Sequence, residues 1–156
     1  MTKQNSTIEI SIVVPLYNES GNIERLTKEI ENALPSNEFH YELILIDDGS
    51  SDNTWSAIEA ASQSSKVVRG LRLSRNFGHQ NALLAGLSEA RGEAIISMDG
   101  DLQHPPSSLP ALIELWRKGN KIVSTKRTQT EHLGLFKTKT SEWFYKIFSW
   151  LSGVQI

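Results

Sequence analysis

Ile8-Glu9-Ile10-Ser11-Ile12-Val13-Val14-Pro15 contains a nearly continuous apolar run. Runs of β-branched residues are typical of a strand that is buried on both faces of a parallel sheet. Pro15 has no backbone N–H, so we expect this strand to end at Val14. Beyond a short polar loop, apolar residues recur at helical spacing up to Pro35, which predicts a helix capped by Ser20 or Asn22. The chain therefore begins with a strand, a loop and a helix.

The same alternation continues along the chain. Further strands are predicted over residues 41–46, 67–73, 93–98 and 121–124, with helical patterns over residues 52–61, 77–91 and 105–119 between them. Asp52 is predicted to cap the first of these helices. Alternating strands and helices predict an α/β fold with a mainly parallel sheet that is flanked by helices on both faces.

Composition excludes several classes of protein. The 156 residues carry 16 basic and 18 acidic side chains, so no overall positive field favours binding to nucleic acid. The absence of cysteine excludes disulfides, zinc–thiolate sites and a thiol nucleophile. Residues 1–6 are polar and lack the apolar core of a signal peptide. No run reaches the roughly 18 apolar residues that span a bilayer, so we expect this chain to be soluble.

Polar clusters follow every predicted strand at its carboxyl end. Open parallel sheets bind their ligands at this edge. Turn chemistry explains any one cluster alone, but it does not explain why all of them fall at one edge. The clusters are Tyr17-Asn18-Glu19, Asp47-Asp48, Arg75-Asn76-Phe77-Gly78, Asp99-Gly100-Asp101 and Lys126-Arg127.

Asp99 and Asp101 form the sharpest pair at this edge. Residues two apart in an extended segment point the same way, and Gly100 permits a tight turn between them. Two converging carboxylates repel each other unless a cation lies between them, and hard oxygen ligands suit Mg²⁺ or Mn²⁺. Gln103 adds a carbonyl oxygen to this set. The alternative is a turn whose aspartates only cap the next helix.

Other residues at the edge suit a nucleoside. Tyr17 can stack on a base, Glu19 can accept a hydrogen bond from the base, and Asp48 can accept one from the base or the ribose. The alternatives are a loop tyrosine packed on a helix, a glutamate favoured by the helix dipole, and a turn aspartate. No histidine pair has metal-ligand spacing, so neither His79 nor His104 is assigned as a ligand.

Four motifs point to one family. They are Val14-Pro15-Leu16-Tyr17-Asn18-Glu19, Asp47-Asp48-Gly49-Ser50-Ser51-Asp52, Arg75-Asn76-Phe77-Gly78-His79-Gln80 and Met98-Asp99-Gly100-Asp101-Leu102-Gln103-His104-Pro105-Pro106. Together they resemble glycosyltransferase family 2, which has the GT-A fold. Within that family they resemble the polyprenyl-phosphate glycosyltransferases, the type of dolichyl-phosphate mannose synthase and undecaprenyl-phosphate glucosyltransferase.

The resemblance implies a reaction and a set of site residues. A sugar would pass with inversion from a nucleotide diphosphate sugar, a UDP-sugar before GDP-mannose, to a polyprenyl phosphate in cell-envelope glycan synthesis. Asp99 and Asp101 would be the catalytic residues, and with Gln103 they would hold Mg²⁺ or Mn²⁺. The implied donor-binding residues are Pro15, Tyr17, Glu19, Ile46, Asp48, Asp99, Gly100, Asp101 and Arg127. The family often carries Gly-x-Arg where this chain has Ser124-Thr125-Lys126-Arg127.

The acceptor explains why no catalytic base is evident. A phosphate monoester has a second pKa near 6, so at pH 7 it is already largely a dianionic nucleophile. A sugar hydroxyl, in contrast, requires a base to remove its proton. Two other functions stay open: a nucleotide-sugar-binding module without turnover, and a family 2 glycosyltransferase directed at a sugar hydroxyl.

The last residues have a different character. Residues 1–135 are predicted to form the donor-binding GT-A domain, and residues 136–156 to begin an amphipathic helical region next to the acceptor. Aromatic and aliphatic residues with nearby lysines fit a membrane interface, or equally a terminal helix packed on its own sheet. We expect a truncated chain, whose full-length protein lies at the cytoplasmic face of the cell membrane with the membrane surface as a partner. A homo-oligomer stays open.

Overall fold

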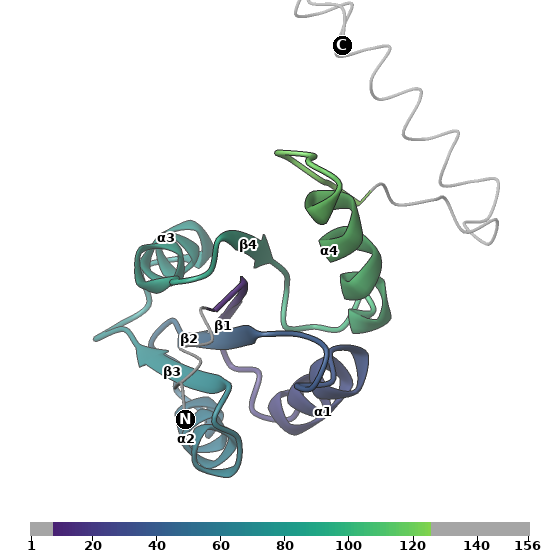
Figure 1. Cartoon of the computed structure of the whole chain (residues 1–156). Helices are drawn as coiled ribbons and strands as arrows, with labels where there is room; N and C mark the ends of the chain where they lie inside the picture. Colours follow the sequence, from purple (N-terminus) through teal and green to yellow (C-terminus); the bar gives the residue numbers. More distant parts are fainter. Residues whose placement is uncertain (1–7, 126–156) are drawn as a thin grey trace, which may run out of the picture. The chain divides into compact units, whose positions relative to one another are not determined.

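The computed structural model describes residues 8–125, which build a four-stranded sheet in the order β3-β2-β1-β4 (Figure 1). Neighbouring strands are parallel throughout this sheet. The strands are β1 (Ile10–Leu16), β2 (Tyr41–Asp47), β3 (Val68–Arg72) and β4 (Ala94–Ser97). The helices are α1 (Ile23–Ala33), α2 (Thr54–Ser64), α3 (His79–Glu89) and α4 (Leu109–Arg117), and the 3₁₀ turn η1 (Pro106–Ser108) precedes α4.

The chain divides into two compact units, residues 1–123 and residues 124–156. Only Ser124 and Thr125 of the second unit belong to the described residues. The predicted boundary after residue 135, the predicted helix beyond it and the basic pair Lys126-Arg127 therefore lie outside the described residues. Within residues 8–125, no helix has both the length and the apolar character needed to cross a bilayer.

Helices cover both faces of the sheet, as predicted. Alternate residues of β1 serve different faces: Ile12 and Val14 pack in a core with residues of α1, α2 and α4, whereas Val13 packs with Ala82 of α3. Figure 1 shows α3 on one side of the sheet and α1 and α2 on the other. A continuous apolar strand is stable here because each of its faces has a partner.

α3 lies unusually close to the sheet. A Cβ atom added at Gly86 would stand 2.5 Å from Val13 Cγ1 and 2.6 Å from Ile46 Cδ1. Glycine therefore permits the helix backbone to rest directly on these side chains. This contact fixes the distance between α3 and the two central strands.

β1 continues through Pro15 to Leu16, beyond the predicted end at Val14. Val13 faces β4, and its carbonyl oxygen accepts the N–H of Met98 at 3.2 Å. Pro15 is the next residue that faces β4, and pairing between β1 and β4 stops at Ser97. The missing N–H of Pro15 falls where no ladder hydrogen bond is formed, so proline does not end the strand.

The strand predicted over residues 121–124 is wrong. The structure gives this segment no helix or strand, and the side chain of Ile122 is 91% exposed. Within residues 8–125, no strand other than β1 pairs with β4. An extended segment here would gain neither ladder hydrogen bonds nor burial. Apolar character alone predicted the strand, and it does not reveal whether a pairing neighbour exists.

A buried polar network fixes the amino end of the sheet. The carboxylate of Glu42 accepts hydrogen bonds from Ser11 Oγ at 2.7 Å and Arg69 Nη1 at 2.6 Å. It also accepts the Arg91 N–H at 2.8 Å, while Ser11 Oγ accepts the Gly92 N–H at 2.8 Å. Burial raises the pKa of Glu42, but these hydrogen bonds outweigh it and keep the pKa below its usual 4.5. The network ties down the turn between α3 and β4.

Candidate functional site

The loops after β1 and β2 are joined into one unit. Ser50 Oγ accepts the N–H of Asn18 at 2.9 Å, and Asn18 Oδ1 in return accepts the N–H of Ser51 at 2.9 Å. Asn18 has a φ of 55°, a left-handed conformation that asparagine tolerates well. Thr54 Oγ1 adds a further link by accepting the Glu19 N–H at 2.9 Å. These reciprocal hydrogen bonds hold the loop that carries Tyr17 and Glu19 against the start of α2.

Asp52 anchors the start of α2, as predicted, although the N-cap position is Asn53. Asp52 Oδ1 accepts the N–H of Thr54 at 2.9 Å and its hydroxyl as well. Its other oxygen accepts the Ser20 N–H at 3.3 Å. The hydrogen bonds from Thr54 and Ser20 lower the pKa of Asp52 from 3.8 to about 2. This side chain therefore ties the loop after β1 to the start of α2.

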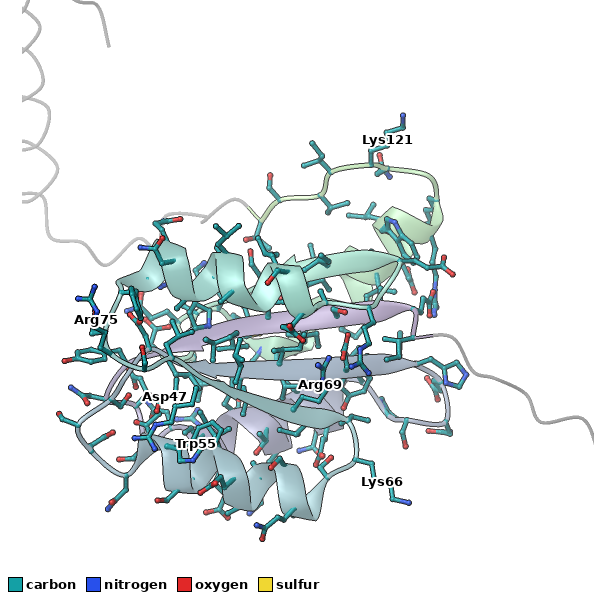
Figure 2. The ribbon with its side chains drawn as sticks, turned by 90° about the vertical axis from the view of Figure 1, so that its left-hand side faces the viewer. Asp47, Trp55, Lys66, Arg69, Arg75 and Lys121 are labelled. Atoms are coloured by element: carbon teal, nitrogen blue, oxygen red, sulfur yellow. The ribbon has the colours of Figure 1, made fainter. Side chains whose placement is uncertain are left out.

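Asp47 is wholly buried at the end of β2. Its Oδ1 accepts the N–H of Ser50 at 2.8 Å, which closes the turn. Its Oδ2 has no hydrogen bond but lies 3.3 Å from Nε of Arg72. The Arg72 guanidinium in turn lies 5.6 Å from the centre of the Trp55 ring, and Figure 2 shows Asp47 and Trp55 at the same end of the sheet as Arg75. Arg72 thus balances the charge of the buried carboxylate.

Asp48 binds the loop that follows β3. Its side chain is 3% exposed, and its two oxygens accept the N–H groups of Phe77 at 2.8 Å and Gly78 at 2.9 Å. Gly49 has a φ of 64°, and a Cβ atom added there would stand 2.2 Å from the carbonyl carbon of Arg75. The two loops therefore pack backbone against backbone. No spacing rule predicts this contact from the sequence.

The residues predicted to hold a nucleoside differ in accessibility. Tyr17 is 48% exposed and is open to stacking. Glu19 is half-buried, and its carboxylate accepts a hydrogen bond from the Asn22 side chain. Pro15 is buried at the end of β1. Ile46 has no exposed surface and lies in the core beneath α3, so it supports the edge from below and adds no surface to a pocket.

The turn after β4 presents both predicted metal-binding aspartates to solvent. Asp99, Asp101 and Gln103 are exposed, and Asp101 Oδ1 accepts the N–H of Gln103 at 3.0 Å. The left-handed residue of the turn is Leu102, with a φ of 60°, and not Gly100. Gly100 is required for space, because a Cβ atom there would stand 2.3 Å from Leu16 Cδ2.

The oxygen donors of this turn fit a hard divalent cation. Within residues 8–125, no three His, Cys, Asp or Glu side chains gather as a metal cage. Mg²⁺ and similar ions are commonly bound by one or two carboxylates together with substrate phosphates, and Asp99 and Asp101 match that arrangement. His79 lies beside them, with Nε2 at 3.8 Å from Asp99 Oδ1. Arg127, the predicted phosphate contact, lies outside the described residues.

Fold and site together define an α/β protein that presents carboxylates and an aromatic ring at the ligand-binding edge of a parallel sheet. The chain belongs to glycosyl transferase family 2, whose model matches residues 11–153. Its fold is the GT-A fold. A solved mannosyltransferase from Pyrobaculum calidifontis, in complex with GDP-Man and Mn²⁺, superposes with a TM-score of 0.63 at 23% identity, over 79% of this chain and 37% of that chain.

Two curated relatives are similar over nearly the whole chain. The prophage bactoprenol glucosyl transferase homolog of Escherichia coli (strain K12) is 41% identical over 149 residues, which are 96% of this chain and 49% of the relative. The undecaprenyl-phosphate 4-deoxy-4-formamido-L-arabinose transferase of Shewanella sediminis (strain HAW-EB3) is 38% identical over 156 residues, which are 99% of this chain and 47% of the relative. The resemblance to polyprenyl-phosphate glycosyltransferases is confirmed, and the chain spans about half the length of these relatives.

Proposed function

We propose that this chain is the donor-binding part of an inverting, metal-dependent glycosyltransferase. The enzyme transfers a sugar from a nucleotide diphosphate sugar to a polyprenyl phosphate in cell-envelope glycan synthesis. The observation that carries the proposal is the exposed Asp99–Asp101 turn at the same sheet edge as Tyr17. The names of the two relatives, which specify bactoprenol and undecaprenyl phosphate, support the choice of acceptor.

Each residue of the edge has a defined task in this proposal. Tyr17 stacks on the base and Glu19 accepts a hydrogen bond from it. Asp99 and Asp101 hold the cation through carboxylate oxygens, with Gln103 beside them. Bound Mg²⁺ or Mn²⁺ neutralises the negative charge that develops on the departing diphosphate. The solved mannosyltransferase of the same fold contains Mn²⁺, which is consistent with this assignment.

The acceptor requires no base from the protein. A lipid phosphate is largely dianionic at pH 7 and attacks the anomeric carbon directly, from the side opposite the diphosphate. Inversion at that carbon follows from a single displacement. The membrane surface that carries the lipid is therefore a partner of the full-length protein, at the cytoplasmic face where nucleotide sugars are made available.

The function is tested with full-length protein and vesicles that contain undecaprenyl phosphate. Radiolabelled UDP-glucose and GDP-mannose are supplied in turn, and the label extracted with the lipid is counted. We expect transfer from a UDP-sugar that EDTA abolishes and Mn²⁺ or Mg²⁺ restores. Nucleotide binding without lipid-linked product from either donor would favour a binding module, and label on a sugar hydroxyl would favour the hydroxyl-directed alternative.

A further inference from the structure

We propose that His79 is a positioning residue of the donor site, which orients the carboxylate of Asp99, and that Asp48 fixes the place of His79. The proposal rests on the proposed function, in which Asp99 holds the cation. It assigns a task to the Arg75–Gln80 motif. None of the donor-binding residues named above belongs to this motif.

His79 lies beside Asp99, at ion-pair distance and beyond hydrogen-bond range. It is the first residue of α3, and its Nε2 atom lies 3.8 Å from Asp99 Oδ1. Across residues 8–125, the structure gives the Asp99 side chain no other hydrogen-bond or ion-pair partner. The side chains are 53% and 55% exposed, so both border the solvent from which the donor arrives. An exposed carboxylate rotates freely unless a neighbouring group restricts it. Metal-binding carboxylates are commonly oriented by such neighbours.

The start of α3 is held from the end of β2. Asp48 accepts the N–H groups of Phe77 and Gly78, the two residues that precede His79. Gly78 has a φ of 90°, and no side chain caps the helix at this position. The buried carboxylate of Asp48 therefore determines where the first turn of α3 begins.

The body of α3 is held as well. Gly86 rests against Val13 and Ile46, and the buried Ala82 packs in the same core. The backbone of His79 is thus fixed between a clamped turn and a packed helix. Asp99 lies beyond the last paired residue of β4, between Met98, whose N–H is bonded to Val13, and the buried Gly100, and its own side chain is 55% exposed. Because the backbone of His79 is held on both sides, its side chain starts from a fixed point beside Asp99.

The test measures the dissociation constant of UDP by calorimetry with and without Mn²⁺, using the 156-residue chain. The dissociation constant without Mn²⁺ divided by that with Mn²⁺, called the metal ratio, reports the contribution of the metal. We expect His79→Ala to reduce this ratio about tenfold, the low end of the effect of removing a partner of a metal ligand. His79→Gln keeps a polar side chain beside Asp99 and should keep most of the ratio. His40→Ala, an exposed histidine at the amino edge of the sheet, should leave it unchanged.

The role of Asp48 is tested by a double-mutant cycle. Asp48→Asn leaves one acceptor for two N–H groups, so we expect the metal ratio to fall in the wild-type background. The same substitution should not reduce the ratio further in the His79→Ala background, because both act through one residue. Additive losses would overturn the role of Asp48, and an unchanged ratio in His79→Ala would overturn that of His79. A wild-type chain whose binding of UDP, GDP and CDP is independent of Mn²⁺ would overturn the metal site itself, and this proposal with it.

Discussion

The three aspartates of the turn after β2 differ in their partners, and so in their tasks. Asp47 is buried against Arg72, Asp48 accepts two backbone N–H groups, and Asp52 binds the start of α2. Each carboxylate oxygen of Asp48 has a further lone pair, so contact with a nucleoside remains compatible with its contacts to the turn. In the proposed site, Asp48 holds the turn and would also bind the donor.

Asp52 makes the stability of the fold depend on pH in the acidic range. Its pKa is lowered from 3.8 to about 2 in the folded chain by the hydrogen bonds from Thr54 and Ser20. A lowered pKa stabilises the fold above the unfolded-state value, and this contribution is lost as pH falls from about 4 to about 2. We expect Asp52→Asn to be less stable than wild type at pH 7, with a difference that shrinks towards pH 2. Urea unfolding across this pH range measures it.

The control for this prediction is Glu59→Gln, which removes a carboxylate from the exposed face of the same helix. Its stability should follow that of wild type between pH 4 and pH 2. If the unfolding free energies of wild type and Asp52→Asn changed in parallel between pH 4 and pH 2, the lowered pKa of Asp52 would be contradicted.

At the scale of elements, α3 depends on a glycine at its contact with the sheet. Gly86→Ala gains up to about 1 kcal/mol of helix propensity. The added Cβ would, however, stand within 2.6 Å of both Val13 Cγ1 and Ile46 Cδ1. Overpacking of this kind costs about 1–3 kcal/mol, so we expect a net loss of up to about 2 kcal/mol of unfolding free energy. Gly21→Ala is the control, since a Cβ atom there meets nothing within 4 Å. Equal effects of the two substitutions in urea unfolding would contradict the close packing.

The network of Glu42 secures the opposite end of the sheet. Glu42→Ala would remove the acceptor of the Ser11 hydroxyl, leave Arg69 with Glu89 alone, and leave the Arg91 N–H with only Ser11 Oγ, at 3.1 Å. Removing one partner of a buried ion pair costs about 3–5 kcal/mol, and we expect about 3 kcal/mol here because Arg69 is partly exposed. Glu24→Ala, which breaks the exposed pair with Lys28, should change stability little in the same measurement. A small effect of Glu42→Ala would show that solvent already replaces the network.

The strands and helices were largely predictable because each depends on a local pattern. Apolar runs and helical spacing located the described strands and helices, and the parallel order placed the polar loops at one edge. The prediction over residues 121–124 was wrong because a strand also needs a neighbour. The end of β1 was predicted at Val14, two residues too early. Proline costs a ladder hydrogen bond only where its backbone faces a paired strand.

The contacts between loops were not predictable from the sequence. Asn18 with Ser50, Asp48 with Phe77, and His79 with Asp99 join residues that are far apart along the chain. Such pairs follow from the strand order, which places β4 next to β1, and from the packing of α3. The sequence identified the residue types of the site but not which of them hold one another.

At the scale of the whole molecule, the proposed function assigns the donor side of the reaction to the described residues. The carboxyl edge combines an accessible aromatic ring, two exposed carboxylates and loops that are fixed by mutual hydrogen bonds. Preorganised groups of this kind act on a transition state without a cost of rearrangement. The chain spans about half the length of its relatives.

A thermal-shift titration with UDP, GDP and CDP, each with and without Mn²⁺, tests the central claim most directly. We expect at least one nucleotide, UDP first, to stabilise the chain only when Mn²⁺ is present. Asp101→Ala should abolish this metal-dependent shift while its melting temperature without ligand stays close to that of wild type, because Asp101 is exposed. Absence of a metal-dependent shift with all three nucleotides, or an undiminished shift in Asp101→Ala, would contradict the assignment of Asp99 and Asp101 as the metal site.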